Sequence, residues 1–140
     1  MARLINHREH WLPLTDFLTE LLTARRAKHT KQSEYVFPGL NGEAFFKEPK
    51  SAVNVVITKS GIKFSCHDLR RTFITIAESL DIPHYALKRL VNQKDGSDVT
   101  AGYIVTEVER LRVPMQRITD SIRERIKQAE SSPELDSAGD

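Results

Sequence analysis

The segment at residues 65–73 reads SCHDLRRTF and decides how the chain folds around it. Ser65 followed three residues later by Asp68 has the spacing of a capping box, which predicts that a helix begins at Cys66 or His67. The Asp-Ile-Pro sequence at 81–83 should stop this helix near Leu80. The charged residues of the segment then fall in the first turns of the helix.

The predicted helix has an apolar stripe and a polar side. The stripe consists of Leu69, Phe73, Ile76, Ala77 and Leu80. His67, Arg70 and Arg71 fall together on the opposite side. A guanidinium beside an imidazole, at a helix N-terminus whose N–H groups favour anions, can bind a phosphate. The spacing leaves an alternative open, in which His67 and Asp68 only cap the helix and the arginines are solvated charges.

A tyrosine follows downstream, in the sequence DVTAGYI at 98–104. The order of these residues resembles the tyrosine recombinases, or phage integrases, whose signature is a His-x-x-Arg box, then a His or Trp, then a nucleophilic Tyr. HWLPLTD at 10–16 looks like the end of the small sheet of that family leading into a helix, and EYVFP at 34–38 looks like its next buried strand. The resemblance extends from about Arg8 to Gln128.

The resemblance implies a role for each residue that matches the signature. Tyr103 is expected to attack the scissile phosphorus, forming a 3′-phosphotyrosyl link while a 5′-hydroxyl leaves. Arg70 is expected to hold the non-bridging oxygens, and His67 to assist proton transfer and phosphate binding. A phenol with an ordinary pKa of about 10 needs neighbouring cations or a base for this attack. Rejoining needs neither ATP nor a metal, because the phosphotyrosine retains the bond energy.

The sequence departs from the family pattern at three points. Gln93, in LVNQ at 90–93, stands where the family usually has His or Trp, and a Gln donates a hydrogen bond but carries no charge. The first arginine of the family lies upstream of the strand at Trp11 and has no counterpart here. The general-acid lysine should fall near Ile5, but no Lys precedes Lys28. We therefore expect the 140-residue chain by itself to be inactive.

Double-stranded DNA is the expected partner, contacted by Arg71, Lys88, Arg89 and Lys94. A non-catalytic function remains an alternative. Residues 72–91 also read as a helix-turn-helix whose second helix could enter a major groove. The groove-facing residues would be His84, Tyr85, Lys88 and Arg89. A degenerate integrase remnant that binds DNA or a recombinase without cutting is a third possibility. The enzyme is preferred because it accounts for the strand, the box and the tyrosine in order.

Length and composition indicate one domain with a hydrophobic core, since the chain has 140 residues of which 39% are hydrophobic. The net charge is +2, and residues 130–140 contain four acidic residues and no Lys or Arg. Without that segment, residues 1–129 carry +6, which suits a polyanionic partner. We expect a catalytic domain over 1–129 and a disordered acidic tail over 130–140.

The single cysteine, Cys66, excludes an internal disulfide and indicates a reducing compartment. We interpret the spacing of His7 and His10 as a strand-edge coincidence, and expect neither a metal nor another cofactor. Apolar runs fall short of the roughly 18 residues that span a membrane, and the N-terminus lacks a signal-peptide pattern. A soluble, cytoplasmic protein is expected.

The remaining elements are predicted to be mostly helical. An amphipathic helix should start at Thr15 or Asp16 and end in the basic run at 25–28, and another should cover residues 51–59. Pro83 should open a helix that runs to Val91. We interpret the first of these helices as a packing helix with a solvated basic end.

A short helix is expected to carry Tyr103, and a final helix should begin at a capping box formed by Thr106 and Glu109. Pro114 predicts a kink there, or two successive helices. The apolar stripe of this helix consists of Val108, Leu111, Met115, Ile118, Ile122 and Ile126. It could pack inside the molecule or mediate self-association on DNA. The expected fold is α+β and mostly α, an integrase-type catalytic-domain fragment with a small β element and about six helices.

Overall fold

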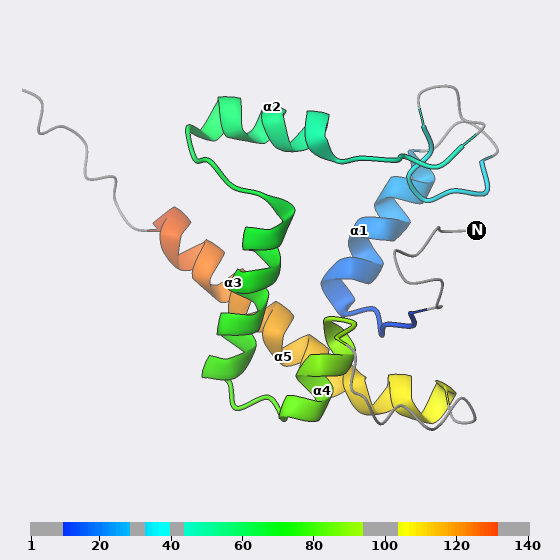
Figure 1. Ribbon diagram of the computed structural model, residues 1–140, viewed down its shortest axis with the longest axis vertical. Coiled ribbons are helices and arrows are strands. Elements are labelled where there is room, and N and C mark those ends of the chain that lie inside the picture. The colour runs from blue at the N-terminus through cyan, green and yellow to red at the C-terminus, as the bar shows by residue number, and fades with distance from the viewer. Residues whose placement is uncertain (1–9, 29–32, 40–43, 94–103, 132–140) are drawn as a thin grey trace, which may run out of the picture.

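A computed structural model of the chain describes residues 10–28, 33–39, 44–93 and 104–131 (Figure 1). The elements in these ranges are the helices α1 (Asp16–Ala27), α2 (Lys50–Ser60), α3 (Cys66–Ser79), α4 (His84–Leu90) and α5 (Ile104–Ser131). The described residues add one isolated antiparallel bridge, between Pro38 and Phe45. The fold is therefore mostly helical.

Local sequence explains where the first two helices begin and end. Thr15 has extended backbone geometry before α1, and its hydroxyl accepts a hydrogen bond of 3.3 Å from the N–H of Leu18. Gly61 ends α2 in the left-handed region at a φ of 71°, where a residue without Cβ is unstrained. Its N–H donates back to the carbonyl of Ile57. The Thr15 cap therefore marks the start of α1, and Gly61 marks the end of α2.

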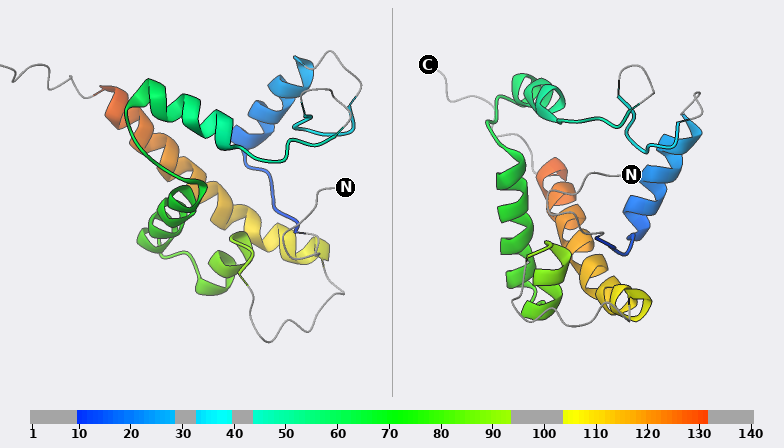
Figure 2. Two further views of the ribbon diagram at one scale, coloured as in Figure 1. Left: turned by 45° about the horizontal axis from the view of Figure 1, so that its top comes forward. Right: turned by 45° about the vertical axis from the view of Figure 1, so that its right-hand side comes forward.

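The hydrophobic core lies between α3, α4 and α5, and α5 packs against both of the other helices (Figure 2). Its buried members are Ile76, Ala77, Ile82, Ala86, Leu87, Leu90, Val91, Leu111 and Ile118. Ala77 and Ile118 are fully buried at 0% exposure. Arg117 of α5 also donates a hydrogen bond of 2.8 Å to the carbonyl of Leu80 at the end of α3. This core comes entirely from residue 76 onward.

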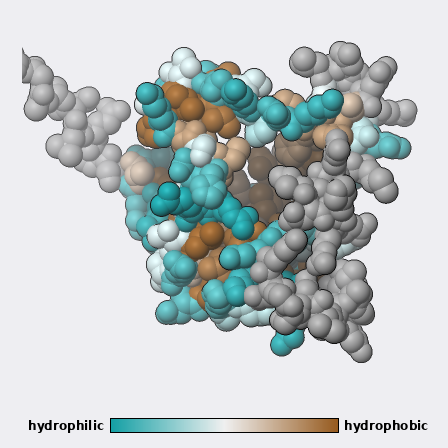
Figure 3. Space-filling view, viewed as in Figure 1, coloured by the Kyte–Doolittle hydropathy of each residue, from teal (hydrophilic) through white to brown (hydrophobic). Residues whose placement is uncertain are grey.

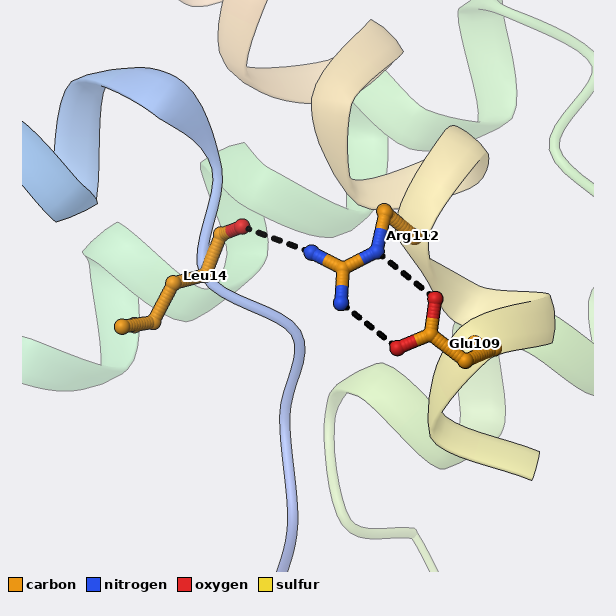
Figure 4. A network of polar contacts seen from close by, with 3 residues as sticks. All are labelled: Leu14, Glu109 and Arg112. Atoms are coloured by element: carbon orange, nitrogen blue, oxygen red, sulfur yellow. Dashed lines mark hydrogen bonds and ion pairs between the residues drawn. The ribbon is translucent and has the colours of Figure 1, made fainter. Parts of the chain in front are cut away.

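In contrast, α1 and α2 contain no buried residue. Polar contacts hold the segment around the start of α1 against the core helices. Arg112 of α5 forms a two-bond pair with the carboxylate of Glu109, at 2.6 and 2.8 Å, and its guanidinium lies 3.4 Å from the carbonyl of Leu14 (Figure 4). The N–H of Asp16 donates to the side chain of Gln116 at 3.2 Å. The first half of the described chain thus joins the core through its polar groups.

The structure confirms the predicted starts of α1 and α3, and α2 extends the predicted helix by one residue at each end. The prediction of a small β element is wrong for the described residues, which contain an isolated bridge and no strand. Residues 10–15 form no strand, and the segment at 34–38 contributes a single bridge residue while Val36 and Phe37 stay 56% and 54% exposed. A strand needs a partner ladder to satisfy its backbone. The described residues provide no such partner.

Helix α5 also differs from the prediction. It begins at Ile104, so Thr106 lies inside it rather than at its start, and Glu109 pairs with Arg112 instead of closing a capping box. The helix continues through Pro114 as one element, and Figure 1 shows it changing direction where yellow passes into orange. It reaches Ser131, which corrects the start of the expected tail.

Five helices are described where about six were expected, and the expected short helix at Tyr103 lies outside the described residues. The rest of the expected tail, 132–140, lies outside them as well. Across the ranges that the structure describes, none of the helices has the length and apolar content needed to span a membrane.

The dependence of the fold on Ile118 can be measured. Ile118→Ala removes a side chain with 0% exposure, so it should lower the free energy of unfolding by about 2–5 kcal/mol. Ile126→Ala, on the same helix but 52% exposed, should change it by no more than about 0.5 kcal/mol. Urea denaturation followed by circular dichroism measures both. Equal effects of the two substitutions would contradict this description of the core.

Candidate functional site

The first turn of α3 is held by the predicted capping box. The hydroxyl of Ser65 accepts a hydrogen bond of 3.3 Å from the N–H of Asp68. In return, the N–H and the hydroxyl of Ser65 both donate to one carboxylate oxygen of Asp68, at 2.9 and 2.7 Å. The start of the helix is therefore fixed by three hydrogen bonds between two side chains and their backbone.

These hydrogen bonds also set the ionisation of Asp68. The side chain of Ser65, and next the backbone N–H of Ser65, hold the pKa of this carboxyl below its ordinary value of 3.8. The positive charges of Arg71 and His67 make smaller contributions in the same direction. Because one of its carboxylate oxygens accepts both hydrogen bonds from Ser65, Asp68 is an anchor for the helix rather than a candidate acid or base.

The side chains of His67, Arg70 and Arg71 are all exposed. Residues three and four apart are neighbours on a helix surface, so all three can reach one anion. Within the described part of the chain, no hydrogen bond or ion pair engages any of these three side chains. Figure 3 shows hydrophilic side chains gathered over the first part of α3. The polar side predicted for this helix is thus present and open to solvent.

The opposite side of α3 anchors this cluster to the core. Ile76 and Ala77 are buried, and Phe73 and Leu80 pack against the core cluster. Leu69 departs from the predicted stripe, because it remains 56% exposed. The helix is therefore fixed along its second half, while its first two turns project beyond the core.

Among the described residues, Gln93 makes no contact with the cluster at the start of α3. Gln93 is exposed beyond the end of α4, where its N–H donates to the carbonyl of Lys88 at 2.9 Å. Helix α4 follows the far end of α3 across a short turn (Figure 1). In the described ranges no interaction joins Gln93 to the α3 cluster. Tyr103 and Lys94 lie outside the described residues.

The two basic residues of α4 are partly buried rather than fully exposed. The guanidinium of Arg89 lies 6.0 Å from the centre of the Tyr85 ring, and the carbonyl of Arg89 accepts a hydrogen bond of 2.8 Å from Nε2 of His10. Both Lys88 and Arg89 have interactions within the protein. They are therefore less available to an external ligand than Arg70 and Arg71.

A second basic surface lies at the end of α1, which the sequence predicted only as the solvated basic end of a packing helix. Leu21 is 51% exposed there and lines a cavity together with Arg25 and Lys28, and Arg26 is exposed on the same helix. The signal that could have identified this surface is the basic run at 25–28 following apolar residues at helical spacing. For metals, the residues that the structure describes include no cluster of three potential ligands.

Comparisons of this chain with models of protein families, with curated proteins and with solved structures find no match.

The contribution of the cap can be tested through its pH dependence. Because the pKa of Asp68 is lowered in the folded protein, its stabilisation is present above 3.8 and is lost as the pH falls below that value. Asp68→Asn should therefore lower the melting temperature at neutral pH, and the difference from wild type should shrink in acid. Thermal unfolding followed by circular dichroism across this pH range measures the effect.

Glu78→Gln provides the matched control, because Glu78 is exposed on the same helix and takes no part in the cap. This substitution should leave the melting temperature close to that of wild type. A difference between wild type and Asp68→Asn that stays constant from neutral pH to acid would contradict the account of the cap.

Proposed function

We propose that this chain is the greater part of the catalytic domain of a tyrosine recombinase, which cuts and rejoins double-stranded DNA through a covalent 3′-phosphotyrosine. One observation supports this proposal most strongly. His67, Arg70 and Arg71 stand exposed and unpaired among the described residues, on the capped start of a helix whose other end is anchored in the core. Such a cluster is suited to a phosphodiester.

In this proposal the cluster supplies preorganised positive charge. The guanidinium of Arg70 donates two parallel hydrogen bonds to the non-bridging oxygens, which are strong because the donor is charged. His67 donates a further hydrogen bond and assists proton transfer. Negative charge that develops on the non-bridging oxygens is best stabilised by donors already in place, and the capping box orders this turn of α3. Tyr103 is the proposed nucleophile.

The proposal ranks the expected DNA contacts by exposure. Arg71 is exposed beside Arg70, whereas Lys88 and Arg89 are partly buried and already have interactions within the protein. Arg71 is therefore the stronger candidate for a phosphate contact, while Lys94 remains a proposal from the sequence. Gln93 is exposed and can offer its amide N–H to the phosphate, which retains part of the role that a His would have.

We also propose self-association on DNA through the final helix, but only through its C-terminal section. Leu111 and Ile118 are buried inside the molecule, so this section of the stripe packs against α3 and α4. Ile126 is 52% exposed and leaves the C-terminal section available to a second molecule. We also propose a cytoplasmic location, where the exposed thiol of Cys66 stays reduced.

A non-catalytic DNA-binding protein is the second candidate. It is favoured by the arrangement of α3 and α4, which are joined by a short turn and leave His84 and Tyr85 exposed on the second helix. However, α4 has only 7 residues, of which Ala86, Leu87 and Leu90 are buried. This leaves few side chains to read bases, so the helix-turn-helix is supported less well than the phosphate cluster.

The proposed chemistry predicts a covalent intermediate. The complete gene product should form an adduct with a nicked suicide DNA substrate, and Tyr103→Phe should abolish the adduct because the phenolic oxygen is absent. Arg70→Ala should reduce the rate of adduct formation by about two orders of magnitude, as is typical of losing one charge-stabilising donor. Denaturing gel electrophoresis of labelled substrate measures both.

Arg125→Ala is the matched control, since it removes an exposed arginine that is not part of the cluster, and it should leave the rate unchanged. An adduct of undiminished yield in the Phe variant would refute the assignment of the nucleophile. DNA binding without an adduct in the wild-type protein would instead favour the non-catalytic candidate.

A further inference from the structure

Two cavities flank the C-terminal half of α1. One, of about 370 Å³, is lined by Leu21, Ala24, Arg25 and Lys28. The other, of about 380 Å³, is lined by Leu22, Arg25 and Arg26 together with residues 33–36. Arg25 lines both, so the two cavities adjoin. Each is large enough to take the apolar side chains of a ligand rather than a single water molecule.

The wall between the two cavities is held in place by Arg25. Its Nε donates a hydrogen bond of 2.8 Å to the carbonyl of Val36, and its guanidinium lies 4.4 Å from the centre of the Phe37 ring. These contacts tie α1 to the segment at 33–39. A ligand therefore meets a wall that is already ordered, which reduces the entropy lost on binding.

Large apolar side chains are exposed around these cavities. Leu21, Val36 and Phe37 are 51%, 56% and 54% exposed, and α1 buries none of its residues. They come from two segments, α1 and residues 33–39, that the Arg25 contacts hold together. Exposed apolar groups gathered at a concave surface are characteristic of an interaction site.

The same surface is basic. Arg25, Arg26 and Lys28 contribute three positive charges, and of the described residues that line the two cavities only Glu34 is acidic. The C-terminus of a helix carries about half a negative charge. Three cations exceed this charge, so the surface stays positive. Neither the side chain of Arg26 nor that of Lys28 forms a hydrogen bond or ion pair in the described ranges. These two charges are available to a ligand.

We propose that this surface, formed by the C-terminal half of α1 and residues 33–37, docks an acidic amphipathic segment of a partner protein. Apolar side chains of the segment fill the two cavities, and its carboxylates pair with Arg26 and Lys28. Charge complementarity selects this occupant. A nucleic-acid backbone would place phosphates against Leu21, Val36 and Phe37, and a second copy presenting the same surface would bring like charges together.

A displayed library of short random peptides, selected on the immobilised 140-residue chain, provides the test. We expect the selected peptides to combine Asp and Glu with apolar residues at helical spacing. A synthetic selected peptide should lose about tenfold in affinity for the Arg26→Glu, Lys28→Glu double variant, since each charge contributes a fraction of that loss. It should lose a comparable amount for Leu21→Asp, whose site is exposed and whose helix can be checked by circular dichroism.

Arg125→Glu, which reverses an exposed charge on α5, is the matched control and should retain wild-type affinity. Selection of no peptides, selection of basic peptides, or affinities that the double variant and Leu21→Asp leave unchanged would each overturn the proposal. A short DNA duplex that displaces the peptide, and whose own binding is weakened by the double variant, would assign the surface to nucleic acid instead. The proposal does not depend on the function proposed for α3.

Discussion

The packing of α5 across α3 and α4 is the constraint on which the rest of the structure depends. Ala77 and Ile118 both lie in this core with 0% exposure, and every buried member of the core cluster lies at residue 76 or later. Burial of these side chains is the main source of hydrophobic stabilisation in the described residues. The second half of the chain therefore forms the packed platform of α3, α4 and α5. The first half is attached to this platform by polar contacts such as the one between Arg112 and Leu14.

This division explains why the two candidate surfaces differ in character. The first turns of α3 extend beyond the platform, so His67, Arg70 and Arg71 are positioned by a rigid helix and yet remain open to a ligand. Before residue 70 the large apolar side chains Leu21, Val36 and Phe37 stay exposed, close to the basic end of α1. One surface is suited to a phosphate and the other to an apolar partner with acidic groups.

Local signals in the sequence predicted most of the helices. The capping box at Ser65 and Asp68 and the cap at Thr15 depend on neighbouring residues, so their consequences could be read directly. The sequence could not predict the exposure of Leu69 or the missing strand at 34–38. Both depend on which distant segments supply a packing or hydrogen-bonding partner. The exposure of Arg70 and Arg71 followed from periodicity, whereas the partial burial of Lys88 and Arg89 follows from how α4 packs against α5.

We propose that the start of α3 binds phosphodiesters. NMR spectroscopy of the arginine and histidine side chains tests this binding most directly. Titration with a short DNA duplex should shift the Nε–H signals of Arg70 and Arg71 and the ring signals of His67. The Nε–H signal of Arg26, which is exposed on α1, should stay unchanged. Shifts confined to residues outside the first turns of α3, with the signals of Arg70 unmoved at saturating DNA, would contradict the account.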